Sequence, residues 1–66
     1  MSQITLAAAR VNAGYSQKYV AEYLNVAPST VRNWEKGETF PKQPMIEKLC
    51  ALYGVSYDAI KFTSSK

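Results

Sequence analysis

Residues 16–37 constrain this 66-residue chain more than any other stretch, because they carry the start and stop signals of two short helices. Ser16 is a favoured N-cap, since its hydroxyl can accept a hydrogen bond from a free N–H of the first helical turn. Asn25 stands where that first helix has to end, and asparagine tolerates the left-handed backbone that a sharp turn needs. Pro28 suits the first position of a second helix, and Gly37 predicts the end of that helix.

The apolar residues of this stretch fall on one face of each predicted helix. Val20, Ala21 and Leu24 share a face of the first helix. Val31 and Trp34 share a face of the second. Ala21 matters because two helices that cross at a steep angle need a short side chain at the point of contact. We therefore expect two helices packed against each other at a steep angle, with these residues in the core.

The same residues resemble the helix-turn-helix of the lambda-repressor and Cro superfamily, also called the XRE family. The family pattern is a Ser/Thr-Gln start, an apolar-Ala pair, an apolar-Gly/Asn-apolar turn and an aromatic-Glu-x-Gly end. The matching residues here are Ser16-Gln17, Val20-Ala21, Leu24-Asn25-Val26 and Trp34-Glu35-Lys36-Gly37. The resemblance extends from Leu6 to about Phe62. It implies an all-α, lambda-repressor-like bundle of five short helices, in which helices 2 and 3 form the motif.

The rest of the chain predicts three further helices and no strand. Residues 3–13 form the first, which begins near Ser2 or Thr5. Residues 44–53 form the fourth and residues 57–61 a short fifth. The β-branched residues never alternate with polar ones over four or more positions, so a strand is not expected. One domain is expected over residues 1–62 (motif 16–37), followed by a polar C-terminal tail at 63–66.

Composition excludes several classes of protein. The chain has no His and a single Cys, which rules out an intrachain disulfide, a zinc site and nucleophilic catalysis with a His base. No apolar run approaches the roughly 18 residues of a membrane helix. Eight Lys and Arg against five Asp and Glu give a net charge of +3, a mild basic bias that suits a polyanionic partner. We therefore expect no enzyme activity, cofactor, metal, small-molecule ligand or membrane.

The outward face of the second motif helix carries the candidate base-reading residues. At about 100° per residue, a helix that buries Val31 and Trp34 turns its opposite side to solvent. That side carries residue types that hydrogen-bond to base edges, namely Ser29, Asn33 and, on the shoulder, Arg32. Pro28 occupies a position that often carries a polar base-reading residue in the resembled family, which puts one base contact in question. The alternative interpretation is an ordinary solvated helix face.

Candidate phosphate contacts flank this face. Gln17 and Lys18 lie in the first turn of the first motif helix, where free N–H groups and the helix dipole favour an anion. The resemblance implies that Gln17 contacts the DNA backbone. Lys36, Thr39 and Lys42 follow the reading helix and are placed to hold phosphates. The alternative is that all five are solvated surface residues.

Two further sets of residues carry structural predictions. Arg10 lies within an apolar stripe, and the resembled family often pairs an Arg and a Glu here, so we predict a partly buried ion pair between Arg10 and Glu35. Tyr57, Ile60 and Phe62 are more apolar residues than a short last helix needs for its own docking. We predict that they form a weak homodimer contact; the alternative is that they only complete the core.

Together these features imply a sequence-specific double-stranded DNA-binding transcriptional regulator, Cro- or repressor-like, of a phage, mobile element or bacterium. It would read the major groove with helix 3 as a weak homodimer on a palindromic operator, in the bacterial cytoplasm or nucleoid. One alternative is a protein-interaction module with a degenerate helix-turn-helix, such as an antitoxin, and another is a bundle without a ligand. The sequence assigns no role to Tyr19 and Tyr23.

Overall fold

Four short α-helices dominate the computed structural model, which describes residues 3–62. The predicted tail at residues 63–66, and Ser2 as a helix start, lie outside the described residues. The elements in chain order are β1 (Ile4–Thr5), α1 (Leu6–Ala13), α2 (Gln17–Leu24), α3 (Pro28–Lys36), α4 (Gln43–Tyr53), the 3-10 helix η1 (Tyr57–Ala59) and β2 (Ile60–Lys61). None of the helices within residues 3–62 is long and apolar enough to cross a membrane.

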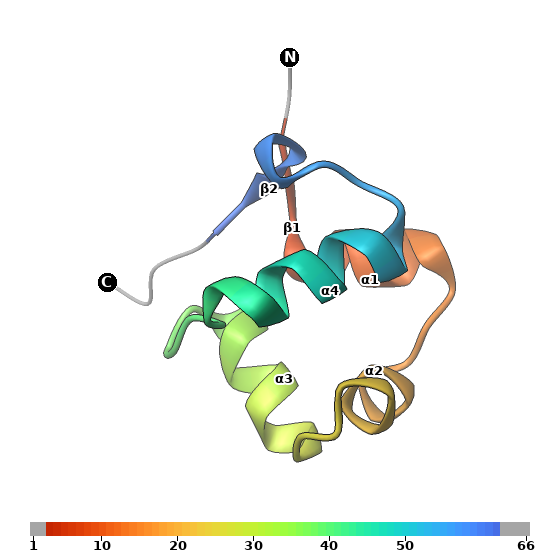
Figure 1. The fold of residues 1–66 in the computed structure, drawn as a ribbon, viewed down its shortest axis with the longest axis vertical. Coiled ribbons are helices and arrows are strands. Elements are labelled where there is room, and N and C mark those ends of the chain that lie inside the picture. The colour runs from red at the N-terminus through yellow and green to blue at the C-terminus, as the bar shows by residue number, and fades with distance from the viewer. Residues whose placement is uncertain (1–2, 63–66) are drawn as a thin grey trace.

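Figure 1 shows how these elements are arranged in space. α1 and α4 lie side by side, and β1 and β2 pair on the far side of them from the motif. α2 and α3 occupy the opposite end, where α2 is seen almost end-on while α3 lies across the view. The two motif helices therefore cross steeply, as predicted, and α3 lies at the edge of the molecule.

Local signals define the ends of the motif helices as predicted. The Ser16 Oγ accepts a hydrogen bond from the Tyr19 N–H at 3.0 Å, which caps α2. Asn25 ends α2 with a φ of 60°, in the left-handed region, and the next residue, Val26, donates its N–H to the Ala21 carbonyl at 2.9 Å. Pro28 opens α3. The turn between α2 and α3 is thus fixed by hydrogen bonds within a few residues of it.

The N- and C-terminal elements differ from the predictions. Residues 57–61 form one 3-10 turn instead of a fifth α-helix, and residues 60–61 extend into β2, so the prediction of no strand was wrong. Ile4 pairs with Ile60 in a parallel register, and the Gln3 amide donates to the Asp58 carbonyl at 3.0 Å. These contacts join segments more than 50 residues apart, so no local alternation of residues announces them. α1 begins at Leu6 and not at residue 3; Thr5, one of the two predicted starts, is its N-cap, and its Oγ1 accepts a hydrogen bond from the Ala8 N–H at 3.1 Å.

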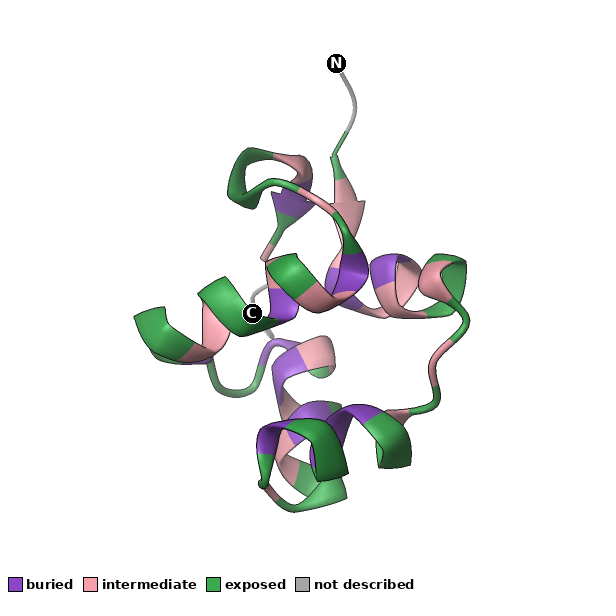
Figure 2. Cartoon of the chain, turned by 45° about the vertical axis from the view of Figure 1, so that its right-hand side comes forward, coloured by how far each residue is buried: buried purple, intermediate pink, exposed green. Residues whose placement is uncertain are grey.

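The core consists of apolar side chains from every α-helix and from β2. They are Leu6, Ala9, Val20, Ala21, Leu24, Val31, Trp34, Leu49, Tyr53 and Ile60. Figure 2 shows such buried positions on the inward sides of the helices and exposed positions on their outer sides. Val20 and Ala21 are fully buried, as the predicted close packing of the two motif helices requires. The core therefore holds α3 firmly by its inner face and leaves its outer face free.

Candidate nucleic-acid interface

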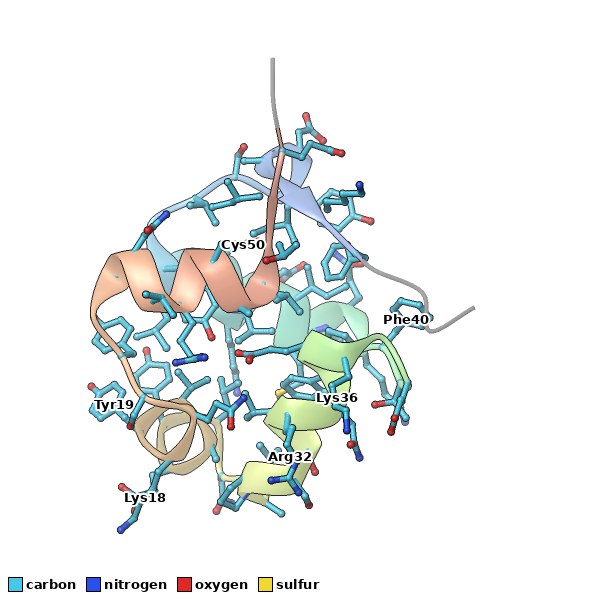
Figure 3. All side chains as sticks on the ribbon, turned by 180° about the vertical axis from the view of Figure 1, so that it is seen from behind. Lys18, Tyr19, Arg32, Lys36, Phe40 and Cys50 are labelled. Atoms are coloured by element: carbon cyan, nitrogen blue, oxygen red, sulfur yellow. The ribbon has the colours of Figure 1, made fainter. Side chains whose placement is uncertain are left out.

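The outer face of α3 is polar, basic and exposed. Ser29, Arg32 and Lys36 are all exposed, as is Pro28 at the start of the helix. Arg32 and Lys36 are four residues apart, so they lie on the same side of α3, where Figure 3 shows both side chains projecting from the helix. Asn33 is only half-exposed, so it is less accessible than the helical periodicity predicted.

Four of the five residues predicted to contact phosphates are exposed: Lys18, Lys36, Thr39 and Lys42. Lys18 extends away from α2 at the end of the molecule that carries the motif (Figure 3). Lys36 Nζ lies 3.8 Å from a carboxylate oxygen of Glu38, and both side chains are more than half exposed. Such a pair is weak, so Lys36 can exchange Glu38 for a phosphate at little cost in free energy. Thr39 and Lys42 are exposed in the chain between α3 and α4.

A polar network joins the C-terminal end of α3 to the first turn of α2. The Arg10 Nε donates to the Glu35 Oε2 at 2.7 Å, and the two side chains are 15% and 6% exposed, so the expected ion pair between α1 and α3 is present and nearly buried. Arg10 Nη1 also donates to the Tyr15 carbonyl at 2.9 Å. The Glu35 Oε1 accepts a hydrogen bond from the Gln17 Nε2 at 2.8 Å. Sequence reasoning missed this last contact, because nothing local links the start of one helix to the end of the next.

The network also affects a neighbouring tyrosine. Burial, assisted by the negative charge of Glu35 and opposed by Arg10, raises the pKa of Tyr53 to about 12. Burial likewise raises the pKa of the Cys50 thiol above its ordinary value. Both groups therefore stay protonated, and hence uncharged, at neutral pH.

Four tyrosine rings form a continuous row from the surface of α2 to the core. The rings of Tyr19 and Tyr15 are 4.9 Å apart between centroids, and Tyr23 follows Tyr19 at 6.4 Å. Tyr15 in turn lies 6.4 Å from the buried Tyr53. This stacking assigns a structural role to Tyr19 and Tyr23, which the sequence left without one, although both rings stay about half exposed. The available signal was the four-residue spacing from Tyr15 to Tyr19 and again from Tyr19 to Tyr23.

The three residues predicted for a dimer contact have different environments. Tyr57 is 54% exposed and packs against the half-buried Phe62, with ring centroids 5.7 Å apart. Ile60 is only 4% exposed, because its pairing with Ile4 turns it into the core of its own chain. Ile60 is therefore not available for a contact between two copies.

Comparison with known proteins agrees with the motif. A helix-turn-helix family model matches residues 6–60, which is most of the chain. The HTH-type transcriptional regulator ImmR of Bacillus subtilis (strain 168) is 42% identical over 50 residues, which cover 76% of this chain and 39% of that protein. The chain thus spans about two fifths of the length of this curated relative. No solved structure gives a significant match. The extent of the family match, together with the capped helices and the turn at Asn25, shows that the chain belongs to the XRE-type helix-turn-helix family.

Proposed function

We propose that this chain is a sequence-specific double-stranded DNA-binding transcriptional regulator that inserts α3 into the major groove. The observation that carries the proposal is the two-sided character of α3. Its inner face is anchored by the buried Val31 and Trp34, whereas its outer face exposes Ser29 and Arg32. An Arg can bind guanine with two hydrogen bonds, and a Ser can bond to several base edges. The regulator named among the relatives supports the same function.

The residues around α3 are proposed to bind the DNA backbone. Lys18, Lys36 and Lys42 are exposed ammonium groups, and Thr39 adds an exposed hydroxyl. Gln17 begins α2 and keeps part of its amide free. In this arrangement the phosphate contacts fix the orientation of the protein, and Arg32, Asn33 and Ser29 supply the discrimination between bases. The site of action would be the bacterial cytoplasm or nucleoid, where the chromosome lies.

Two copies are proposed to bind a palindromic operator, because a single short reading helix buries too little surface for tight and specific binding. The exposed Tyr57 and its neighbour Phe62 are the proposed contact between the copies. The pair is small, so self-association in free solution should be weak and should strengthen when both half-sites are occupied.

The decisive experiment is selection of bound sequences from a random pool of DNA duplexes, followed by salt titration on the selected duplex. We expect two inverted half-sites about one helical turn apart. The logarithm of the binding constant should fall linearly with the logarithm of salt concentration. Recovery of unenriched sequences together with undetectable binding of any duplex would refute the proposal.

One observation favours the alternative, a protein-interaction module such as an antitoxin. The exposed rings of Tyr19 and Tyr23, with the 62% exposed Val11, place apolar surface on α1 and α2. If the selection fails while substitution of Tyr19 abolishes binding to a protein encoded beside this one, the interaction module replaces the DNA-binding proposal.

A further inference from the structure

The Glu35 carboxylate accepts hydrogen bonds from two side chains. One is the Arg10 guanidinium, and the other is the amide of Gln17 at the start of α2. Its Oε1 accepts from the Gln17 Nε2 at 2.8 Å, and the Arg10 Nη2 approaches the same oxygen at 3.4 Å. The Glu35 side chain is 6% exposed, so water competes little for these bonds. Gln17 itself is half-buried. A buried anion at the end of α3 therefore fixes a side chain in the first turn of α2.

The chemistry of the two groups determines which way the Gln17 amide faces. An ionised carboxylate only accepts hydrogen bonds, so the NH₂ of Gln17 must point toward Glu35 and its carbonyl must point away. One of the two N–H groups is thereby occupied. A phosphate also only accepts hydrogen bonds, so the second N–H of Gln17 is the part of this amide that can bind one.

We propose that Glu35 is a positioning residue for DNA binding: it fixes the Gln17 amide so that its second N–H donates to a backbone phosphate. This inference rests on the proposed DNA-binding function. A glutamine that is held before binding loses little rotamer freedom on binding, whereas a free one loses more. Arg10 contributes indirectly, because it holds Glu35 and also donates to the Tyr15 carbonyl just before α2.

The test uses the duplex obtained by selection, prepared as a set in which one phosphate at a time is replaced by an uncharged methylphosphonate. The wild-type protein should lose about three- to tenfold in affinity at the phosphate that Gln17 binds, as expected for one hydrogen bond. Gln17→Met, which leaves the Arg10–Glu35 pair in place, should show no loss at that phosphate. Glu35→Gln should lose most of the same sensitivity, because an amide at position 35 can turn either its N–H or its carbonyl toward Gln17.

Glu38→Gln is the matched control. It makes the same chemical change at an exposed carboxylate near the end of α3 whose contact is with Lys36, not Gln17. Its sensitivity at that phosphate should equal that of the wild type. If Glu35→Gln retains full sensitivity, Glu35 only stabilises the fold and the proposal is wrong. If Gln17→Met changes sensitivity at no phosphate, Gln17 does not bind one and the proposal fails as well.

A measurement on the unaltered protein covers the case in which Glu35→Gln does not fold. The side-chain NH₂ of Gln17 should be rigid in the free protein by ¹⁵N relaxation, whereas that of the exposed Gln43 should be mobile. Equal mobility of the two amides would overturn the proposal. Failure of the DNA-binding function itself is distinct, because the wild-type protein would then bind none of the duplexes.

Discussion

Replacing Arg10 with Met should cost this domain most of its stability. The Glu35 side chain is 6% exposed, and after the substitution its carboxylate keeps one donor, the Gln17 amide. The Tyr15 carbonyl loses its Arg10 donor at the same time. Removing one partner of a buried ion pair typically costs about 3–5 kcal/mol, because the remaining charge is left unpaired. A single domain of this size has only about 3–5 kcal/mol of net stability.

The expected change in melting temperature is large. For a domain of 60–100 residues, 1 kcal/mol corresponds to about 4–8 °C, so a loss of ~3 kcal/mol lowers Tm by about 12–24 °C. Glu35→Gln should be milder than Arg10→Met. The Arg10 side chain is more exposed, at 15%, and an amide at position 35 can still accept from it. Arg10→Lys should lie between wild type and Arg10→Met, since it keeps the charge but not the planar fork of donors.

Thermal and urea denaturation followed by far-UV circular dichroism measure these differences. Lys36→Met is the control, because it also removes a cation from an ion pair, but from one that is more than half exposed and 3.8 Å long. It should change stability by only about 0–1 kcal/mol. A shift of one or two degrees in Arg10→Met, equal to that of the control, would refute the reasoning that the Arg10–Glu35 pair is buried and energetically coupled.

The remaining predictions address the turn, the DNA contacts, the dimer and the pH dependence. Asn25→Gly should leave the thermal stability unchanged or raise it, and Asn25→Ala should lower it by about 1–2 kcal/mol, because the φ of 60° is left-handed. In titrations of the selected duplex, Arg32→Ala should relax specificity at one base pair, while Lys36→Ala should weaken all sequences and reduce the salt slope by about one unit. Tyr57→Ser should weaken self-association in sedimentation experiments and lower stability by no more than about 0.5–1.5 kcal/mol, since the ring is 54% exposed and its aromatic contact is with Phe62. The pKa of Tyr53 is raised from 10.0 to about 12, so the folded state holds the phenol proton more tightly than the unfolded state does. The stability that this difference contributes is complete below pH 10.0 and is lost as pH rises through about 12. Tyr53→Phe should abolish the part of the alkaline loss of stability that comes from Tyr53.

The features of the fold that could be predicted from the sequence are those determined within a few residues. Ser16 caps α2 through the N–H three residues later, and Asn25 and Pro28 define the turn by their own backbone preferences. The pairing of Ile4 with Ile60 could not be predicted in this way. A two-residue ladder has no periodicity, and its formation depends on how the intervening helices bring the two segments together.

In the candidate site, too, the features set by a single helix could be predicted, and those that depend on how helices pack together could not. Helical periodicity placed Ser29 and Lys36 outward and Arg32 on the shoulder, because burying Trp34 fixes the rotation of α3 about its axis, and all three residues are exposed. Periodicity overestimated the exposure of Asn33, since it says nothing of how the surrounding chain covers a residue. Helical periodicity could not predict the hydrogen bond from Gln17 to Glu35, because this bond depends on the angle at which α2 and α3 cross.

Glu35 contributes both to the stability of the fold and to the proposed DNA contact. Glu35 receives hydrogen bonds from α1, through Arg10, and from α2, through Gln17, while its own backbone belongs to α3. A change at position 35 therefore alters the fold and the presentation of Gln17 together. A change at Gln17 removes only the second of these, because the ion pair with Arg10 remains. A substitution of Gln17 on α2 therefore removes the phosphate contact without removing the ion pair, whereas a substitution of Glu35 on α3 affects both. For this reason Gln17→Met, and not Glu35→Gln, isolates the phosphate contact.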